Sequence, residues 1–142
     1  MKKILIPVDG SENSLRAVQS VINQAKDAAA QMEIHLLNVQ PPVITGDVKM
    51  FVSQEAINAY YHDEGIKALA SARAAFEAAG VPYVFHIGLG HVAETIAAYA
   101  KEKGCDQIVM GARSLGALTG LLLGSVTTKV VHLAEVPVTL VK

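Results

Sequence analysis

Two hydrophobic patterns alternate along the chain. Nearly continuous apolar runs are typical of strands buried on both faces of a sheet, whereas apolar residues three or four positions apart indicate helices. The apolar runs are KKILIPV, EIHLLNV, PYVFHIG, CDQIVMG and VPVTLV, at 2–8, 33–39, 82–88, 105–111 and 136–141. Apolar residues three or four positions apart occur after Ser11, throughout 53–79 and 91–104, and again from Val126. The chain is therefore predicted to alternate strands with helices.

This alternation predicts an α/β fold with a parallel sheet. Parallel neighbours need long crossover connections, and helices supply them. No linker, repeat or low-complexity segment interrupts the 142 residues, a length that suits one domain. We expect a single doubly wound, Rossmann-like domain over 1–142, with a five-stranded parallel sheet and helices on both faces. Pro7 should lie where the first strand ends, and Ser11 should cap the first helix.

Composition excludes several classes of partner. The net charge is −1 and no block of one sign occurs, so neither a nucleic acid nor a membrane surface is an expected partner. The apolar run after the first lysines is too short for a signal peptide. One cysteine, Cys105, excludes an internal disulfide and suits a reducing compartment. We expect a cytoplasmic protein.

The segments that follow the strands are where a ligand is expected. In open α/β sheets, ligands bind beyond the carboxyl ends of the strands. The fourth such segment starts at Gly111 and contains the sequence GARSLGALTGLLLGSV. It ends on Gly124 and Ser125 at the start of a helix, where free N–H groups and the helix dipole attract anions, and Arg113 could pair with the same charge. The alternative is that Ser125 caps its own helix and the glycines only form turns.

Asp9 follows the first strand and argues for a different part of a ligand. A carboxylate there would repel phosphates, and the segment has neither a Walker loop nor a Rossmann glycine fingerprint. Ribose hydroxyls suit a carboxylate instead. Together with an anion site after the fourth strand, this predicts a nucleotide lying across the edge of the sheet. The alternative for Asp9 is a turn or capping residue.

No catalytic or metal-binding residue is expected. Phosphoryl transfer needs a metal and a positioned nucleophile, and the glycine-spaced segment has no Walker lysine. The histidines are His35, His62, His86, His91 and His132, and their spacing does not match a metal site. His91, near the expected site, is interpreted as a polar residue at a helix start, and Cys105 as a structural thiol.

Three stretches resemble the universal stress protein family: ILIPVDGSENS, DQIVMGAR with LLLGSV, and VPVTLV. ATP-binding members have a glycine, two residues, a second glycine, nine residues, and Gly-Ser or Gly-Thr. Here Gly111 begins that register and Gly124 with Ser125 ends it, but Ser114 replaces the second glycine. If that position needs a positive φ, serine costs about 1 kcal/mol there, which would weaken the site without abolishing it.

The resemblance implies a strand order of 3-2-1-4-5 and a homodimer that pairs through the last, edge strand. It implies a non-catalytic, stress-response or regulatory protein that binds ATP or AMP, with Mg²⁺ compatible with the phosphates. The alternatives are a slow ATPase that uses the same pocket and a nucleotide-free dimeric interaction module. These motifs do not identify a regulatory protein partner. The nucleotide-binding residues implied are Pro7, Val8, Asp9, Val39, Met110, Gly111, Arg113, Ser114, Gly124, Ser125 and Val126.

Overall fold

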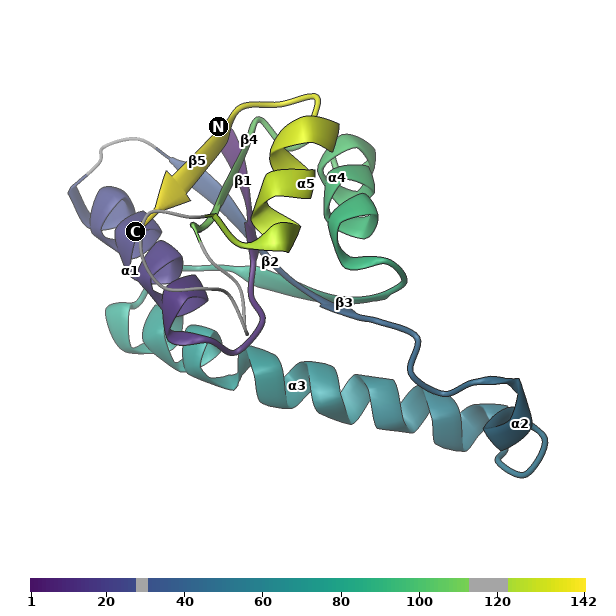
Figure 1. Ribbon diagram of the computed structural model, residues 1–142. Helices are drawn as coiled ribbons and strands as arrows, with labels where there is room; N and C mark the ends of the chain where they lie inside the picture. The colour runs from purple at the N-terminus through teal and green to yellow at the C-terminus, as the bar shows by residue number, and fades with distance from the viewer. Residues whose placement is uncertain (28–30, 113–122) are drawn as a thin grey trace.

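A five-stranded parallel sheet forms the centre of the molecule, with strand order β3-β2-β1-β4-β5 (Figure 1). The computed structural model describes residues 1–27, 31–112 and 123–142. The strands are β1 (Lys2–Pro7), β2 (Met32–Gln40), β3 (Val84–Leu89), β4 (Gln107–Gly111) and β5 (Val138–Val141). The α/β fold class and the strand order implied by the resemblance are therefore confirmed.

Helices connect the strands and cover both faces of the sheet. They are α1 (Glu12–Asp27), α2 (Gly46–Lys49), α3 (Gln54–Ala79), α4 (Val92–Glu102) and α5 (Ser125–Leu133). Only the single turn α2 was not predicted, because four residues are too few for a hydrophobic period. The expected boundaries hold at the first connection: β1 ends at Pro7, and the Ser11 Oγ accepts a hydrogen bond from the Ser14 N–H at 3.1 Å.

The two faces of the sheet have separate cores. Ile4 and Ile6 of β1 point to the face covered by α1 and α3, and Leu5 points to the face covered by α4 and α5 (Figure 1). The side chains of all three are fully buried. Because successive side chains of a strand face opposite ways, a strand covered on both sides must be apolar throughout. This explains the continuous apolar runs in the sequence.

An arm extends from the sheet. It consists of the segment 43–53, which includes α2, and the first half of α3 (Figure 1). Tyr61 holds its base, because the phenolic oxygen accepts hydrogen bonds from the N–H groups of Val43 and Ile44, both at 3.0 Å. At its tip Met50 is 80% exposed and Phe51 88% exposed. The tip lies away from the carboxyl ends of β1 and β4 (Figure 1).

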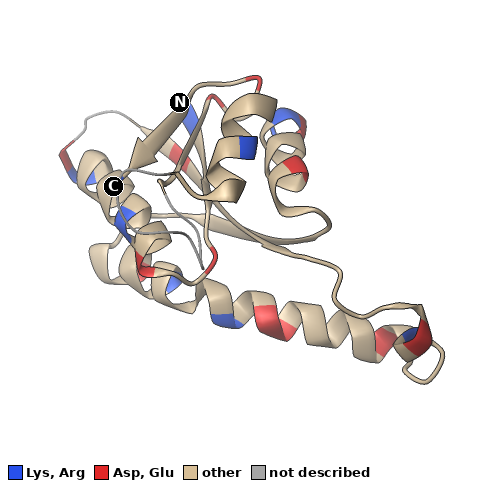
Figure 2. Cartoon of the chain, in the orientation of Figure 1, with Lys and Arg blue, Asp and Glu red and all other residues tan. Residues whose placement is uncertain are grey.

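Charged residues are interspersed over the surface. In the view of Figure 2, acidic and basic residues are both scattered over the elements, with no long block of one sign. Within the described ranges, no helix is both long and apolar enough to cross a bilayer.

Candidate functional site

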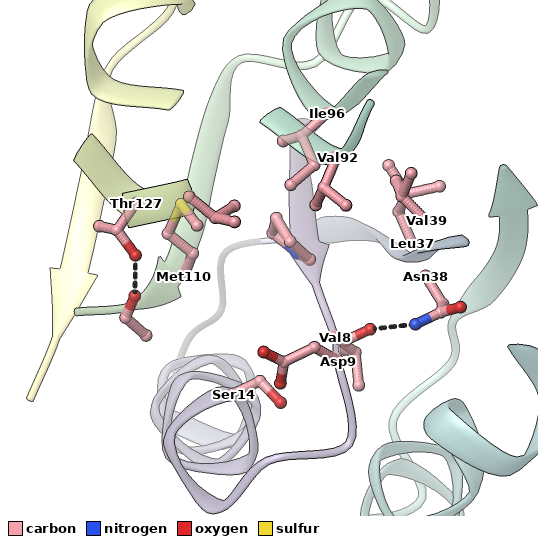
Figure 3. A pocket seen from close by; sticks show the side chains of 13 residues that line it. Val8, Asp9, Ser14, Leu37, Asn38, Val39, Val92, Ile96, Met110 and Thr127 are labelled. Carbon is pink, nitrogen blue, oxygen red and sulfur yellow. Dashed lines mark hydrogen bonds between the residues drawn. The ribbon is translucent and has the colours of Figure 1, made fainter. Parts of the chain in front are cut away.

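A pocket opens at the carboxyl ends of β1, β2 and β4, between the starts of α4 and α5 (Figure 3). It offers about 410 Å³ of space when its open mouth is included. The residues that line it are Pro7, Val8, Asp9, Ser14, Leu37, Asn38, Val39, Val92, Ile96, Met110, Gly111, Val126 and Thr127. This is the end of a doubly wound sheet at which ligands bind.

Seven of the site residues expected from the sequence line this pocket: Pro7, Val8, Asp9, Val39, Met110, Gly111 and Val126. Gly124 and Ser125 do not line it but directly precede Val126 at the start of α5. Arg113 and Ser114, with most of the glycine-spaced segment, lie outside the described residues. The fold thus brings together residues from three strands and one helix, and their roles toward a ligand remain predictions.

The end of β1 places Asp9 in the pocket. The Val8 N–H donates to the Leu37 carbonyl at 2.8 Å, which continues the pairing with β2 one residue beyond the strand. The Asp9 carboxylate lies beside Ser14 of α1 (Figure 3). Its Oδ1 accepts a hydrogen bond from the Ser11 N–H at 2.9 Å. Asp9 therefore stabilises the turn into α1, as the alternative interpretation expected, while its carboxylate also lines the pocket.

Asn38 is a pocket residue that the sequence analysis missed. It is 4% exposed, and its Nδ2 donates to the Val8 carbonyl at 2.8 Å (Figure 3). Its Oδ1 accepts from the Gln40 side chain at 2.7 Å. Asn38 thereby joins the ends of β1 and β2 at the floor of the pocket. A lone amide in the otherwise apolar run LLNV was the signal that could have identified it, because a buried amide needs partners.

The start of α5 is tied to the end of β4. The Thr127 hydroxyl, which is fully buried, donates to the Gly111 carbonyl at 3.1 Å (Figure 3), and the Gly124 N–H donates to the Ala112 carbonyl at 3.1 Å. Thr127 was also missed, because a threonine one turn into a helix has no distinctive pattern. These bonds fix the direction in which the first N–H groups of α5 point.

Gly111 has a packing role that the sequence analysis did not predict. We expected it to allow a sharp turn or the approach of a ligand; it is not among the positive-φ glycines of the described ranges, which are Gly10, Gly80, Gly90 and Gly104, and the approach of a ligand stays a prediction. A Cβ added at Gly111 would instead collide with the Asn13 Oδ1 and come within 2.7 Å of the Asn13 carbonyl oxygen. The glycine therefore allows β4 to lie directly against the first turn of α1.

The start of α5 is a potential anion site. Its N-cap is Gly124, with φ −66° and ψ 157°, so Ser125 is the first helical residue and does not occupy the capping position that the alternative required. The first N–H groups of a helix have no acceptor within the helix, and the positive end of the dipole lies there. An anion such as phosphate fits these donors.

The described residues include no group of three or more His, Cys, Asp or Glu side chains arranged to hold a metal ion. His91 is exposed and is the N-cap of α4, as interpreted from the sequence. Cys105 is buried, and this burial raises the pKa of its thiol. A thiol with a raised pKa is a poor nucleophile at neutral pH, which agrees with a structural role.

Comparison with known proteins agrees with this geometry. The model of the universal stress protein family matches residues 1–142. Universal stress protein MJ0531 of Methanocaldococcus jannaschii is 37% identical over 142 residues, covering 99% of this chain and 82% of its own length.

Solved structures are similar along the whole chain. The structure of the hypothetical protein MJ0577 has a TM-score of 0.82 and 30% identity, covering 99% of this chain and 95% of that one. A universal stress protein in complex with cAMP has a TM-score of 0.67 and 25% identity, covering 99% of this chain and 96% of that one. With a family model matching every residue and a relative more than one-third identical, this chain belongs to the universal stress protein family.

Proposed function

We propose that this protein binds an adenine nucleotide, ATP or AMP, in the pocket at the carboxyl ends of β1, β2 and β4, and acts as a regulatory protein that holds the nucleotide without turning it over. The observation that carries the proposal is the convergence of Asp9, Val39, Gly111 and Val126, from four separate segments, on one pocket. A solved relative that was crystallised with cAMP supports the class of ligand.

Each part of the nucleotide has a complementary group. The apolar side chains of Val39, Val92 and Ile96 suit the adenine ring, with the backbone of Val39 available at its edge. The Asp9 carboxylate suits the ribose hydroxyls. The phosphates extend toward the N-terminus of α5, where the N–H groups of Ser125 and Val126 lie. In this proposal Arg113, Ser114 and Mg²⁺ also contact the phosphates.

Nucleotide titration of the wild type and of Asp9→Asn tests the ribose contact. The variant keeps an oxygen for the Ser11 N–H but loses the charge, and a charge-assisted hydrogen bond is worth about 1.5–3 kcal/mol. We expect binding about ten- to a hundredfold weaker by calorimetry, after removal of any nucleotide that co-purifies and is detected by mass spectrometry. Asp47→Asn, on the exposed arm, is the matched control and should bind like the wild type.

Two further ligands complete this experiment. Adenosine should bind more weakly than AMP, because it lacks the group that the α5 N-terminus would hold. Chromatography of the ATP sample after long incubation measures hydrolysis, and ADP formed above the buffer rate would favour the slow ATPase. If neither ATP nor AMP binds at millimolar concentration, the nucleotide proposal is wrong and the interaction module is favoured.

We also propose that two copies pair through β5. This strand lies at the edge of the sheet, with β4 as its neighbour. The Pro137 carbonyl, just before β5, accepts from the Ile108 N–H, and the Val141 carbonyl accepts from the Ala112 N–H. Because successive residues of a strand direct their backbone groups to opposite sides, those of Val138 and Leu140 point to the open edge. An unprotected apolar edge strand readily pairs with its own copy around a two-fold axis.

Sedimentation velocity tests this pairing. We expect a dimer for the wild type and a shift toward monomer for Leu140→Pro, which removes an N–H that points away from β4 and is tolerable at an edge. Circular dichroism of the variant must show that the fold is retained. A wild type that sediments as a monomer at all concentrations contradicts the proposal.

A further inference from the structure

A pair of histidines lies outside the pocket, on the face of the sheet that α4 covers. His35 of β2 is 8% exposed and His86 of β3 is partly buried. The His35 Nδ1 and the His86 Nε2 are 2.9 Å apart. The nucleotide proposal gives these side chains no role. We call His35 and His86 the histidine pair.

The two rings meet edge to edge. Their planes differ by 5° and their centroids are 5.2 Å apart. This separation equals the 2.9 Å between the nitrogens plus the distance from each centroid to its own nitrogen, so the rings lie nearly in one plane and are joined in line. Such an arrangement needs one proton between the two nitrogens. It is a directed hydrogen bond and not a contact between ring faces.

Glu33 determines where the protons of the pair are. Its Oε2 lies 2.7 Å from the His35 Nε2, and a carboxylate can only accept, so the His35 Nε2 carries a proton. In the neutral pair the His35 Nδ1 is therefore an acceptor, and the His86 Nε2–H donates to it. Lys3 reinforces this order, because its Nζ lies 3.3 Å from the same Glu33 oxygen.

The pair can accept one additional proton with its hydrogen bond intact, but not two. With one, both hydrogen bonds survive: one proton stays between the two facing nitrogens, and the added proton occupies the outer ring nitrogen of His86, Nδ1. With two, both rings are imidazolium and both facing nitrogens carry protons, so the bond between them cannot form. The second protonation must therefore push His35 and His86 apart.

The charged groups around the histidine pair make a single positive charge on the pair more favourable than two. Besides Glu33 and Lys3, the neighbouring charge is Lys103 at the end of α4, and the Tyr99 ring of α4 packs on His86 at 5.8 Å. A hollow of about 540 Å³ is lined by Met1, Glu33 and His35, among other residues.

Two pKa shifts follow from these surroundings. Burial lowers the pKa of His86, and the charges of His35 and Lys103 lower it further. The hydrogen bond from His35, followed by that from Lys3, lowers the pKa of Glu33. Because the unfolded chain binds a proton at His86 more readily than the folded one, stability falls as pH drops below the ordinary histidine pKa of 6.5.

The pair is connected to the nucleotide pocket by two elements. The strand β2 that carries His35 continues to Asn38 and Val39 in the pocket. The helix α4 that lies on His86 carries Ile96, which also lines the pocket. Packing at this point is tight, since a Cβ added at Gly88 of β3 would come within 3.4 Å of the Tyr99 ring. A separation of the two histidines would therefore displace α4 or β2.

We propose that the histidine pair is an acid-responsive switch for the nucleotide pocket: His35 and His86 lock β2, β3 and α4 together at neutral pH, and binding of the second proton releases them and weakens nucleotide binding. This inference rests on the proposed function. By linkage, a bound nucleotide makes the second protonation of the pair harder to the same degree.

The first test uses nuclear magnetic resonance on the nucleotide-free protein. Histidine ring signals should show two coupled steps for the pair, and the amide signals of Val39 and Ile96 in the pocket should shift with the second step. His86→Gln keeps an N–H that can donate to the His35 Nδ1 but cannot take up the second proton, so in this variant the pocket signals should no longer respond. Independent titration of the two rings, or pocket signals that ignore the second step, overturns the switch.

The second test measures the affinity for AMP from about pH 7.5 down to the lowest pH at which circular dichroism shows an intact fold, because burial and the neighbouring charges lower the pKa of His86. We expect the wild type to lose more affinity than His86→Gln as the pH falls, approaching the roughly tenfold limit that one unit of pKa coupling sets for one proton. The phosphate titrates equally in both proteins. His91→Gln, near the pocket, and His132→Gln, exposed on α5, are the matched controls and should follow the wild type.

These tests separate the two proposals. If AMP does not bind at any pH but the pocket signals follow the second protonation, the nucleotide proposal fails while the conformational switch stands. If AMP binds and the pH profiles of the wild type and His86→Gln coincide, the switch is wrong and nucleotide binding stands.

Discussion

Replacing Gly111 by alanine is expected to destabilise the protein by about 1–3 kcal/mol and to weaken nucleotide binding in the same variant. The added methyl group would collide with the Asn13 side chain and approach the Asn13 carbonyl oxygen to 2.7 Å, and backbone cannot move aside as a flexible side chain can. Either β4 or the first turn of α1 must shift. Both carry pocket residues, Met110 on β4 and Ser14 on α1, so the strain is transmitted to the site.

Urea unfolding and AMP titration of Gly111→Ala measure these two effects. Gly46→Ala is the matched control, because nothing lies within 4 Å of the position of its added Cβ and no positive φ is required there. Its stability should stay within about 0.5 kcal/mol of the wild type, with unchanged affinity. A Gly111→Ala variant as stable as Gly46→Ala would mean that β4 and α1 are not closely packed at this point.

Replacing Phe76 by alanine is expected to lower the free energy of unfolding by about 3–5 kcal/mol, the largest effect that we predict. Phe76 of α3 is fully buried in the core on the α1 and α3 face, with its ring 5.5 Å from that of Tyr83. The substitution removes most of the apolar area of the side chain and leaves a cavity that the sheet cannot close. Denaturant unfolding followed by circular dichroism measures the change.

Phe51→Ala makes the same chemical change on the exposed arm, where Phe51 is 88% exposed. It should change stability by no more than about 0.5 kcal/mol. The contrast between the two variants separates the loss of core packing from the loss of a phenylalanine as such. Equal destabilisation of Phe51→Ala and Phe76→Ala would indicate that the tip of the arm is buried in solution.

The strands and helices could be predicted because each is a local pattern. The continuous run at β1 indicates burial on both faces, and Ile4, Leu5 and Ile6 are fully buried on alternate sides. The same reasoning identified the strand ends as the place for a ligand, and Asp9 and Gly111 line one pocket there. The strand predicted from the run PYVFHIG began at Pro82, two residues before β3 begins, because proline has no N–H to donate to a neighbouring strand.

The order of the strands came from the family resemblance, since periodicity does not say which strands become neighbours. Residues whose role depends on those neighbours were missed or misread. Asn38 was missed because its partner, the Val8 carbonyl, lies on another strand. The packing role of Gly111 was missed because Asn13, which leaves no room for a Cβ there, is on a helix almost a hundred positions earlier.

The sequence by itself determined the α/β class and the approximate elements, and it pointed to the strand ends where the pocket lies, because burial and helical or strand period are properties of short stretches. Only the tertiary structure decided that Asn38 holds the floor of the pocket, and that the ring nitrogens of His35 and His86, 51 positions apart, lie 2.9 Å from each other. The physical reason is that hydrogen bonds and close packing act over a few ångströms, and such distances between remote residues exist only once the sheet has formed.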